Sequence, residues 1–420
     1  MIGTSRRSLH QPPPPPPWSC HVPLQVSEGK DGVNAVLTPP FLLEYGSDVE
    51  DKAPNILQHI FSLFTNVRSG SDMTRFQLPP LFNHPKSQLQ CFGESVYCIG
   101  DDYLSRCSSG ETPLDRFIAV VGWSISTTRP AVFGVAPYNP ILGETHHVSR
   151  GTLNVFLEQV SHNPPVSALH ATDEKEIVEM IWCQQPAPTF HGASVEAVVH
   201  GKRELKLLNH GENYVMNSPN LLIRLFPRSG VDWVGTVSIR CEESELEAEL
   251  YYKGPSFLGF KGNQRSVKGK IFETKTLKTI YEVEGHWDRH ISFLQKSIIL
   301  ETVILKDVHN GKASTVIYNA KEVFSKLKTP VVKDPEGLWT TESAVVWGEL
   351  SESILSKDWD KAREAKRAVE EKERELQRER RSNGETWVPK HFTVSYTKER
   401  GWECSPKQKW VPPAPIVVPF

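Results

Sequence analysis

The chain has 420 residues, of which 38% are hydrophobic and 23% charged, and its formal net charge is −2. This composition is typical of a folded globular protein rather than a disordered one. The near-zero charge argues against a broad nucleic-acid-binding surface, which requires a basic stripe.

The cysteines and the hydropathy pattern indicate the cellular compartment in which the protein is expected. The seven cysteines are odd in number and form no C-x-x-C pair, so neither a disulfide framework nor a structural zinc site is expected. No stretch approaches the roughly 18 apolar residues of a membrane span, and Arg6 and Arg7 are not followed by the apolar core of a secretory signal. We therefore expect a cytosolic protein that touches membranes peripherally and transiently.

Residues 1–50 are expected to form a disordered, proline-rich tail. Six consecutive prolines, Pro12 to Pro17, favour a polyproline II run. This run is interpreted as a stiff spacer, with a ligand for an aromatic-groove domain as the alternative.

Residues 54–67, within the segment 51–70, have the pattern of an amphipathic helix that begins at Pro54. A helix docked on the core and a mobile lid over an apolar cavity both fit this pattern. The apolar face contains Ile56, Leu57, Ile60, Phe61, Leu63 and Phe64, followed by Val67.

The middle of the chain is dominated by short strands. Residues 113–127 have helical spacing, but from about 131 to 320 brief β-prone runs alternate with turn residues, and Asn310-Gly311 is a hairpin signal. Many strands with few helices between them predict a β-rich α+β protein built on a sandwich or a large barrel. The expected strands are Asn154–Val160, Ile177–Cys183, Leu205–Leu208, Leu221–Phe226, Trp233–Cys241, Glu247–Tyr252, Lys270–Phe272, Ile280–Val283, Ile298–Leu305 and Thr315–Tyr318.

Residues 351–381 are predicted to form one long charged helix with a narrow apolar stripe. Lys366, Glu370 and Arg374 are spaced i, i+4, i+8, so they share a face on which Glu370 could hold both cations. This face is either an ordinary solvated surface or a pair of cations aimed at the barrel. In the following tail, 385–420, the expected packing anchors are Trp387, Phe392, Trp402 and Trp410.

The most specific segment is Glu158–Pro165, EQVSHNPP. Two prolines end the strand abruptly, because proline cannot continue a ladder. At such an irregular end, His162 and Asn163 could serve one site, and both side chains can donate hydrogen bonds to a phosphate.

EQVSHNPP resembles the E-Q-V-S-H-H-P-P signature of the oxysterol-binding-protein-related family, with Asn163 in place of the second histidine. Residues 137–144, PYNPILGE, resemble the K-P-x-N-P-x-L-G-E segment of that family, with Ala136 where lysine is usual. The charged helix and residues 387–392, WVPKHF, also match. The resemblance covers about residues 54–415 and is to the short plant members.

The resemblance implies a lipid-binding domain over residues 51–415. Its fold would be a large incomplete antiparallel β-barrel around a lipid tunnel, with an N-terminal helical lid and C-terminal helices. The tunnel would take a sterol or a phosphoinositide such as phosphatidylinositol 4-phosphate. The headgroup site at its mouth would comprise His162, Asn163, Asn139, Lys366, Arg374 and Glu370.

The implied function is non-vesicular lipid transfer between membranes, with no catalysis and no cofactor. A lipid sensor or scaffold that transports nothing is the alternative, and protein partners stay open. A metal-dependent enzyme is the remote alternative, because five residues in a short span are plausible ligands, although their spacing matches no common metal motif. These are Glu144, His146, His147, Glu158 and His162. No nucleophile elbow, P-loop or dinucleotide-binding motif occurs.

Overall fold

The structure, a computed structural model, describes residues 35–40, 60–97, 100–227, 229–254, 265–288, 302–308 and 314–420, all within the unit Val33–Phe420. The helices are η3 (Pro80–Phe82), α3 (Gln88–Tyr97), α4 (Gly100–Ser109), α5 (Pro113–Ser126), α6 (Ala320–Ser325), α7 (Ser343–Val346), α8 (Gly348–Leu355) and α9 (Trp359–Ser382). The strands are β1 (Asn83–Ser87), β2 (Ala136–Tyr138), β3 (Thr145–Arg150), β4 (Leu153–His162), β5 (Pro165–Asp173), β6 (Val178–Phe190), β7 (Ser194–Leu207), β8 (Glu212–Met216), β9 (Asn220–Arg224), β10 (Gly230–Cys241), β11 (Leu246–Lys253), β12 (Ser266–Glu273), β13 (Thr279–His286), β14 (Thr302–Asp307), β15 (Ser314–Asn319), β16 (Val331–Val332), β17 (Phe392–Thr397), β18 (Gly401–Pro406) and β19 (Ile416–Val417).

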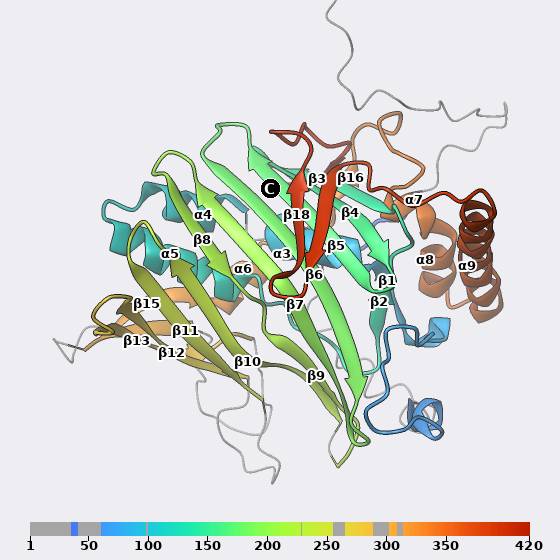
Figure 1. The fold of residues 1–420 in the computed structure, drawn as a ribbon, viewed down its shortest axis with the longest axis horizontal. Helices are drawn as coiled ribbons and strands as arrows, with labels where there is room; N and C mark the ends of the chain where they lie inside the picture. The colour runs from blue at the N-terminus through green and yellow to red at the C-terminus, as the bar shows by residue number, and fades with distance from the viewer. Residues whose placement is uncertain are drawn as a thin grey trace, which may run out of the picture. The chain divides into compact units, whose positions relative to one another are not determined.

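Fifteen strands form one sheet in the order β15-β14-β13-β12-β11-β10-β8-β7-β6-β5-β4-β3-β19-β16, with β9 beside β10 and β7. Neighbours are antiparallel except that β19 runs parallel to β3. Among the described residues the edge strands β15 and β16 do not pair with each other, so the sheet stays open (Figure 1). The prediction of a β-rich α+β fold with a large incomplete antiparallel barrel is confirmed.

The two faces of the sheet differ in chemistry, as β11 illustrates. Its residues alternate between the faces, so that Leu246, Ala248, Leu250 and Tyr252 are buried. The outward residues are charged or polar and pair across strands: Lys268 and Lys306 both lie 2.7 Å from Glu284. The inner face is therefore apolar and the outer face of these strands is solvated.

Helices α3 to α5 cover part of the inner face. Helix α5 begins with a capping box between Thr112 and Asp115 and packs its apolar residues against β15 and β11. At Gly122 a Cβ atom would lie 2.6 Å from the Ile317 carbonyl oxygen of β15, so glycine permits this close approach. Helix α3 packs on β3 and β4. The helices thus connect strands from distant parts of the sheet.

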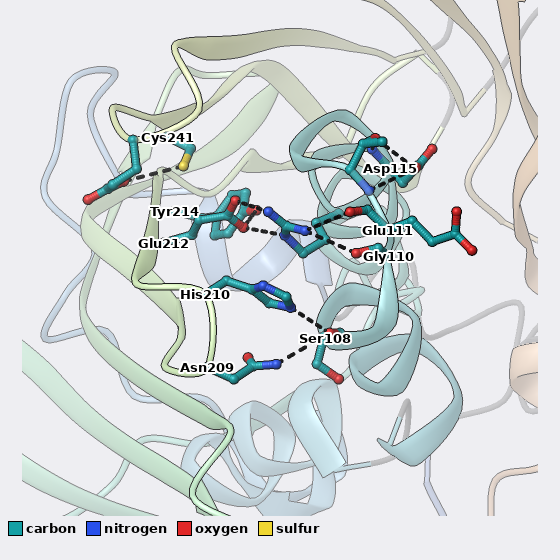
Figure 2. A network of polar contacts seen from close by, with 12 residues as sticks. Ser108, Gly110, Glu111, Asp115, Asn209, His210, Glu212, Tyr214 and Cys241 are labelled. Carbon is teal, nitrogen blue, oxygen red and sulfur yellow. Dashed lines mark hydrogen bonds and ion pairs between the residues drawn. The ribbon is translucent and has the colours of Figure 1, made fainter.

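A polar network ties α4 and α5 to the β7–β8 turn (Figure 2). The Arg116 guanidinium donates to both carboxylate oxygens of Glu212, at 2.8 and 2.6 Å, and the Tyr214 hydroxyl donates to the same carboxylate. Nearby, His210 Nε2 lies 2.8 Å from the Ser108 carbonyl. Arg116 and Glu212 are both buried, which makes this a buried ion pair with its hydrogen bonds satisfied.

The C-terminal hairpin covers the outer face of the sheet instead. Strands β17 and β18 pair antiparallel and lie over β4 to β7 (Figure 1). Phe392 packs there with Phe156 and Val166, as the sequence predicted for an anchor of the tail. Trp387 packs closely on Gly143, where a Cβ atom would lie 2.6 Å from the indole ring.

The N-terminal prediction is wrong for residues 35–40. Their backbone and side chains are held by the body of the protein: the Val36 N–H donates to the Ala344 carbonyl at 3.0 Å, and Thr38 is buried. Lys86 adds a hydrogen bond to the Pro39 carbonyl. Leu37 packs against the main core. The polar and proline-rich composition of residues 1–50 gave no sign of this contact. The polyproline run lies outside the described residues.

The single helix expected over 351–381 is also wrong, because two helices occupy this segment. Helix α8 ends at Leu355, and Lys357 then adopts a left-handed conformation with φ of 60°. The Asp358 side chain caps α9 by accepting the Lys361 N–H. The apolar stripe does pack, with Ala362 and Ala365 buried.

The other predicted elements are largely confirmed. Helix α5 matches residues 113–127, and each expected strand falls on β4 to β15. Residues 298–301 and the Asn310-Gly311 turn lie outside the described residues. Within the described part of the chain, no helix is long and apolar enough to cross a membrane.

Candidate functional site

The EQVSHNPP segment forms the end of the β4–β5 hairpin. Strand β4 ends at His162, Asn163 and Pro164 form the turn, and β5 begins at Pro165. The pairing with β5 shifts register between Gln159 and Ser161, which gives the irregular strand end that the sequence predicted. His162 is partly buried, and Asn163 is exposed at the tip.

The segment 136–140 lies directly against this hairpin. The Nδ1 atom of His162 is 3.1 Å from the Pro140 carbonyl oxygen, so the imidazole donates there. Tyr138 is buried and stacks on Trp347 with 4.8 Å between ring centroids. Asn139 is exposed between these fixed neighbours. The two sequence motifs therefore meet, as expected.

Strand β1 lies between Lys366 and the segment 136–140 and bonds to both. β1 runs parallel to β2 with Asn83 opposite Ala136, and the Asn83 amide donates to the Ala136 carbonyl at 3.3 Å. The Lys366 ammonium donates to the Asn83 side-chain oxygen at 2.8 Å and to the Leu78 carbonyl. Burial lowers the pKa of Lys366, and the charge of Glu370 opposes that shift.

The other two residues of the helix face lie further from this point. Arg374 is exposed and pairs with Glu371 at 3.0 Å and with Glu370 at 3.4 Å. At 1.5 Å per residue, Arg374 is about 12 Å along α9 from Lys366. Glu370 therefore bonds to Arg374, whereas the Lys366 ammonium turns towards η3 and β1. Of the two cations, Lys366 lies beside the 136–140 segment.

The carboxylates of the two motifs hold backbone and side chains in place. Glu158 accepts the backbone N–H groups of Lys390 and His391 at 2.7 and 2.9 Å, which joins EQVSHNPP to WVPKHF. Glu144 accepts from Ser343 at 2.7 Å and Trp347 at 2.8 Å. Burial raises the pKa of both carboxyls and the hydrogen bonds oppose the shift. Both glutamates are structural.

The five residues considered as metal ligands do not converge. His146 Nδ1 contacts Glu342 at 2.7 Å, whereas His147 Nε2 contacts the Pro412 carbonyl at 2.9 Å on the opposite face of β3. Glu144 and Glu158 have the separate partners given above. No group of three metal-ligating side chains occurs among the residues described.

The amphipathic segment lies next to the start of α9. Residues 60–64 are helical, and Ile60, Leu63 and Phe64 pack in a cluster with Phe190 of β6 and Val195 of β7. Phe61 remains 42% exposed, while Ile56 and Leu57 lie outside the described residues. A cleft of about 590 Å³ separates this helix from η3 and α9; its lining includes Leu63, Leu81, Trp359 and Arg363.

Asn83 is the site residue that sequence reasoning missed. It is buried, with 6% exposure, and belongs to no motif. It reaches the site only through the parallel pairing of β1 with β2, across 53 residues of chain. Local pattern carries no signal for such a contact.

Comparison with known proteins shows which family the chain belongs to. The family model described as oxysterol-binding protein matches residues 61–412. Oxysterol-binding protein-related proteins 4C and 4B of Arabidopsis thaliana are 52% and 51% identical, over 92% and 91% of this chain and 99% and 97% of their own lengths.

Solved structures share the fold. The Osh1 ORD domain in complex with cholesterol superposes with a TM-score of 0.69, at 21% identity and 90% coverage of both chains. The Osh3 ORD in complex with PI(4)P from Saccharomyces cerevisiae gives 0.60, at 20% identity, covering 91% of this chain and 94% of that one. This chain is a member of the oxysterol-binding protein family.

Proposed function

We propose that this protein binds a sterol against the inner face of the sheet and carries it between membranes, exchanging it for phosphatidylinositol 4-phosphate. Family membership supports a lipid ligand, and the solved relatives are complexes with cholesterol, ergosterol and PI(4)P. We propose no catalytic activity.

The observation that carries the sterol proposal is a set of unsatisfied donors on an otherwise apolar inner face. The Nε1 atoms of Trp123 and Trp182 are buried without a hydrogen-bond partner among the described residues, and their rings are 6.3 Å apart. Arg203, also buried, lies 5.4 Å from the Trp182 ring and donates to Thr127 and the Asn217 carbonyl. Buried donors without partners are costly.

A sterol has the chemistry that fits this face. Its ring system is apolar, and burying it contributes about 25 cal/mol per Å² before the cost of ordering. Its single hydroxyl can accept a hydrogen bond from an indole N–H. A ligand of this kind would bury its apolar rings against this face and satisfy a buried donor at once.

The phosphoinositide part rests on the cluster at the β4–β5 hairpin. Lys366 is joined through Asn83 to Ala136, at the start of the 136–140 segment, and His162 contacts Pro140 at its end. We propose that these two side chains, with Asn163 and Asn139, are the phosphate donors. A phosphate would gain charge-assisted bonds of about 1.5–3 kcal/mol each from such donors. Arg374 and Glu370 would border the site from further along α9.

We propose that residues 54–67 are the lid over the bound lipid. The helix packs on the ends of β6 and β7 rather than within the main core, and Phe61 remains exposed for membrane contact. Deleting residues 54–67 should speed sterol dissociation and alter liposome binding. An unchanged off-rate, or an unfolded product, would instead show that this is an ordinary core helix.

We place the protein in the cytosol, with transient attachment to membranes. The five described cysteines, Cys91, Cys107, Cys183, Cys241 and Cys404, are free thiols, which suits a reducing compartment. Fractionation of cells that express a tagged chain tests this placement.

A two-liposome assay separates the carrier from the sensor or scaffold. Donor vesicles contain labelled sterol, acceptor vesicles contain phosphatidylinositol 4-phosphate, and a cholesteryl ester replaces sterol in the control. We expect net sterol transfer and no transfer of the ester, which lacks the free hydroxyl. Saturable sterol binding without transfer would support the sensor.

One variant tests the donor set directly. Trp182→Phe removes the indole N–H but keeps an aromatic ring, and should weaken sterol affinity about 2–10-fold, since a neutral hydrogen bond contributes about 0.5–1.5 kcal/mol. Trp402→Phe on the outer hairpin is the matched control and should have no effect. Equal affinity in both variants would contradict this role for Trp182.

A further inference from the structure

The Asn83 side chain holds the Lys366 ammonium and also bonds to the backbone of β2. Asn83 accepts the ammonium hydrogen through Oδ1 at 2.8 Å and donates through Nδ2 to the Ala136 carbonyl at 3.3 Å. An ammonium can only donate and a backbone carbonyl can only accept, so this amide orientation alone satisfies both neighbours.

The rigid surroundings of Asn83 define where the ammonium lies. Asn83 is the first residue of β1, is 6% exposed, and lies opposite Ala136 in the parallel β1–β2 pair. A buried amide with both ends bonded cannot reorient without losing a bond. The ammonium is therefore fixed beside Ala136, at the site where the family pattern usually has a lysine.

The acceptors of Lys366 are neutral. Its two hydrogen bonds go to the Asn83 amide oxygen and to the Leu78 carbonyl, and a third donor position of the ammonium remains. A neutral oxygen orients a cation without cancelling its charge. The charge of Glu370 acts on Lys366 from one turn away without a direct bond to it, so the third donor position stays available to an anion.

We propose that Asn83 is a positioning residue for phosphate binding: it fixes the Lys366 ammonium beside β2, next to Ala136, where the family pattern usually has a further cation. This inference rests on the proposed phosphoinositide binding and adds Asn83 to it. The phosphate is contacted by Lys366, whereas Asn83 acts through Lys366 and contributes nothing to sterol binding.

Two substitutions at Asn83 separate positioning from structural support. Asn83→Leu removes both hydrogen bonds at similar volume, and should lower phosphatidylinositol 4-phosphate extraction affinity about tenfold, the size of one charge-assisted bond. Asn83→Asp still holds the ammonium, but as an ion pair that cancels its charge, and should also lower the affinity. Sterol affinity should remain at the wild-type value in both variants.

A rescue variant tests whether a cation on β2 can compensate for a Lys366 ammonium that is no longer positioned. Ala136→Lys in the Asn83→Leu background supplies a cation from β2 itself, and should restore phosphoinositide affinity to within about threefold of wild type. The measurement is extraction from phosphatidylcholine vesicles that contain either phosphatidylinositol 4-phosphate or sterol, with the full chain and with thermal unfolding recorded for each variant.

The outcomes distinguish a failure of the Asn83 role from a failure of the proposed phosphoinositide binding. A folded wild-type chain that extracts no phosphoinositide would contradict the proposed function. If wild type extracts it and Asn83→Leu does so equally well, the positioning role is wrong. A parallel fall in sterol and phosphoinositide affinity in both variants, without rescue, would show that Asn83 is only structural.

Discussion

A buried cation and a partly buried cation in this protein are held in opposite ways. Arg116, between α5 and the β7–β8 turn, is matched by both carboxylate oxygens of Glu212 (Figure 2). Lys366, between α9 and β1, is held by the neutral oxygens of Asn83 and Leu78. Arg116 is buried and Lys366 is partly buried, yet only Arg116 has a counter-charge in direct contact.

The difference separates a structural cation from one that can bind a ligand. A bidentate arginine–carboxylate pair satisfies charge and geometry completely, and it connects helices to the sheet. A lysine that is oriented by neutral acceptors has no bonded counter-charge, and this one lies beside β1. The following predictions test whether the two clusters really differ in this way.

The largest expected effect is loss of stability when the Arg116 pair is broken. Glu212→Gln leaves a buried guanidinium without its counter-charge, which should cost about 3–5 kcal/mol in the free energy of unfolding. Urea denaturation measures this cost. Glu111→Gln, at an exposed neighbour, should change stability by at most about 0.5 kcal/mol. Equal midpoints for the two variants would contradict the structural role of the pair.

The second prediction concerns acid stability. Burial lowers the pKa of His147 and of His391 to about 4. Because the unfolded state binds these protons near pH 6.5 and the folded state does not, stability is lost as pH falls from 6.5 towards 4. At pH 5, each histidine should lower the free energy of unfolding by about 2 kcal/mol relative to its value at pH 7.

Urea midpoints at pH 7 and pH 5 measure this loss. His147→Gln keeps an N–H donor for the Pro412 carbonyl but does not titrate, so its stability should vary less with pH than that of wild type. A wild-type midpoint that does not fall at pH 5 would contradict the assignment of these histidines as neutral buried groups.

The third prediction compares the two cations of α9. Lys366→Met should lower phosphatidylinositol 4-phosphate affinity about 10–100-fold, the equivalent of a charge-assisted bond of about 1.5–3 kcal/mol. Arg374→Met should lower it less, because Glu370 and Glu371 already neutralise that guanidinium. The double reversal Lys366→Glu plus Arg374→Glu should abolish extraction and spare sterol binding. If both lipids are lost equally, α9 is purely structural.

The smallest expected effect is a gain at the hairpin tip. Asn163 is neutral, whereas a histidine there would carry charge below about pH 6.5. Asn163→His should therefore raise phosphoinositide affinity a few-fold at pH 6 and little at pH 8, with sterol affinity unchanged. Tight extraction by wild type, with no gain from histidine, would show that asparagine is a full substitute.

The sequence predicted what local pattern determines. β-prone runs separated by turn residues located the strands, and the paired prolines marked the hairpin end at His162 and Asn163. The break between α8 and α9 depends on one left-handed residue, Lys357, and on the cap at Asp358. Lysine and aspartate are both common in charged helices, so the sequence of residues 351–381 did not indicate that the helix breaks there.

What could not be predicted depends on contacts between distant segments. Asn83 and Lys366 are separated by 283 residues, and no local feature links them. Glu158 and Glu144 have the composition of ligand residues, but their partners are backbone and side-chain donors far along the chain. Their structural role follows from burial, which residue type alone does not specify.

The central claim is that a sterol lies against the apolar inner face of the sheet. Trp123, Trp182 and Trp287 are at most 2% exposed and belong to the core cluster of that face. Titration with a fluorescent sterol should therefore quench tryptophan emission by energy transfer and saturate at about one sterol per chain. A folded protein that shows no saturable quenching, or that takes up sterol only in proportion to vesicle surface, would contradict the claim.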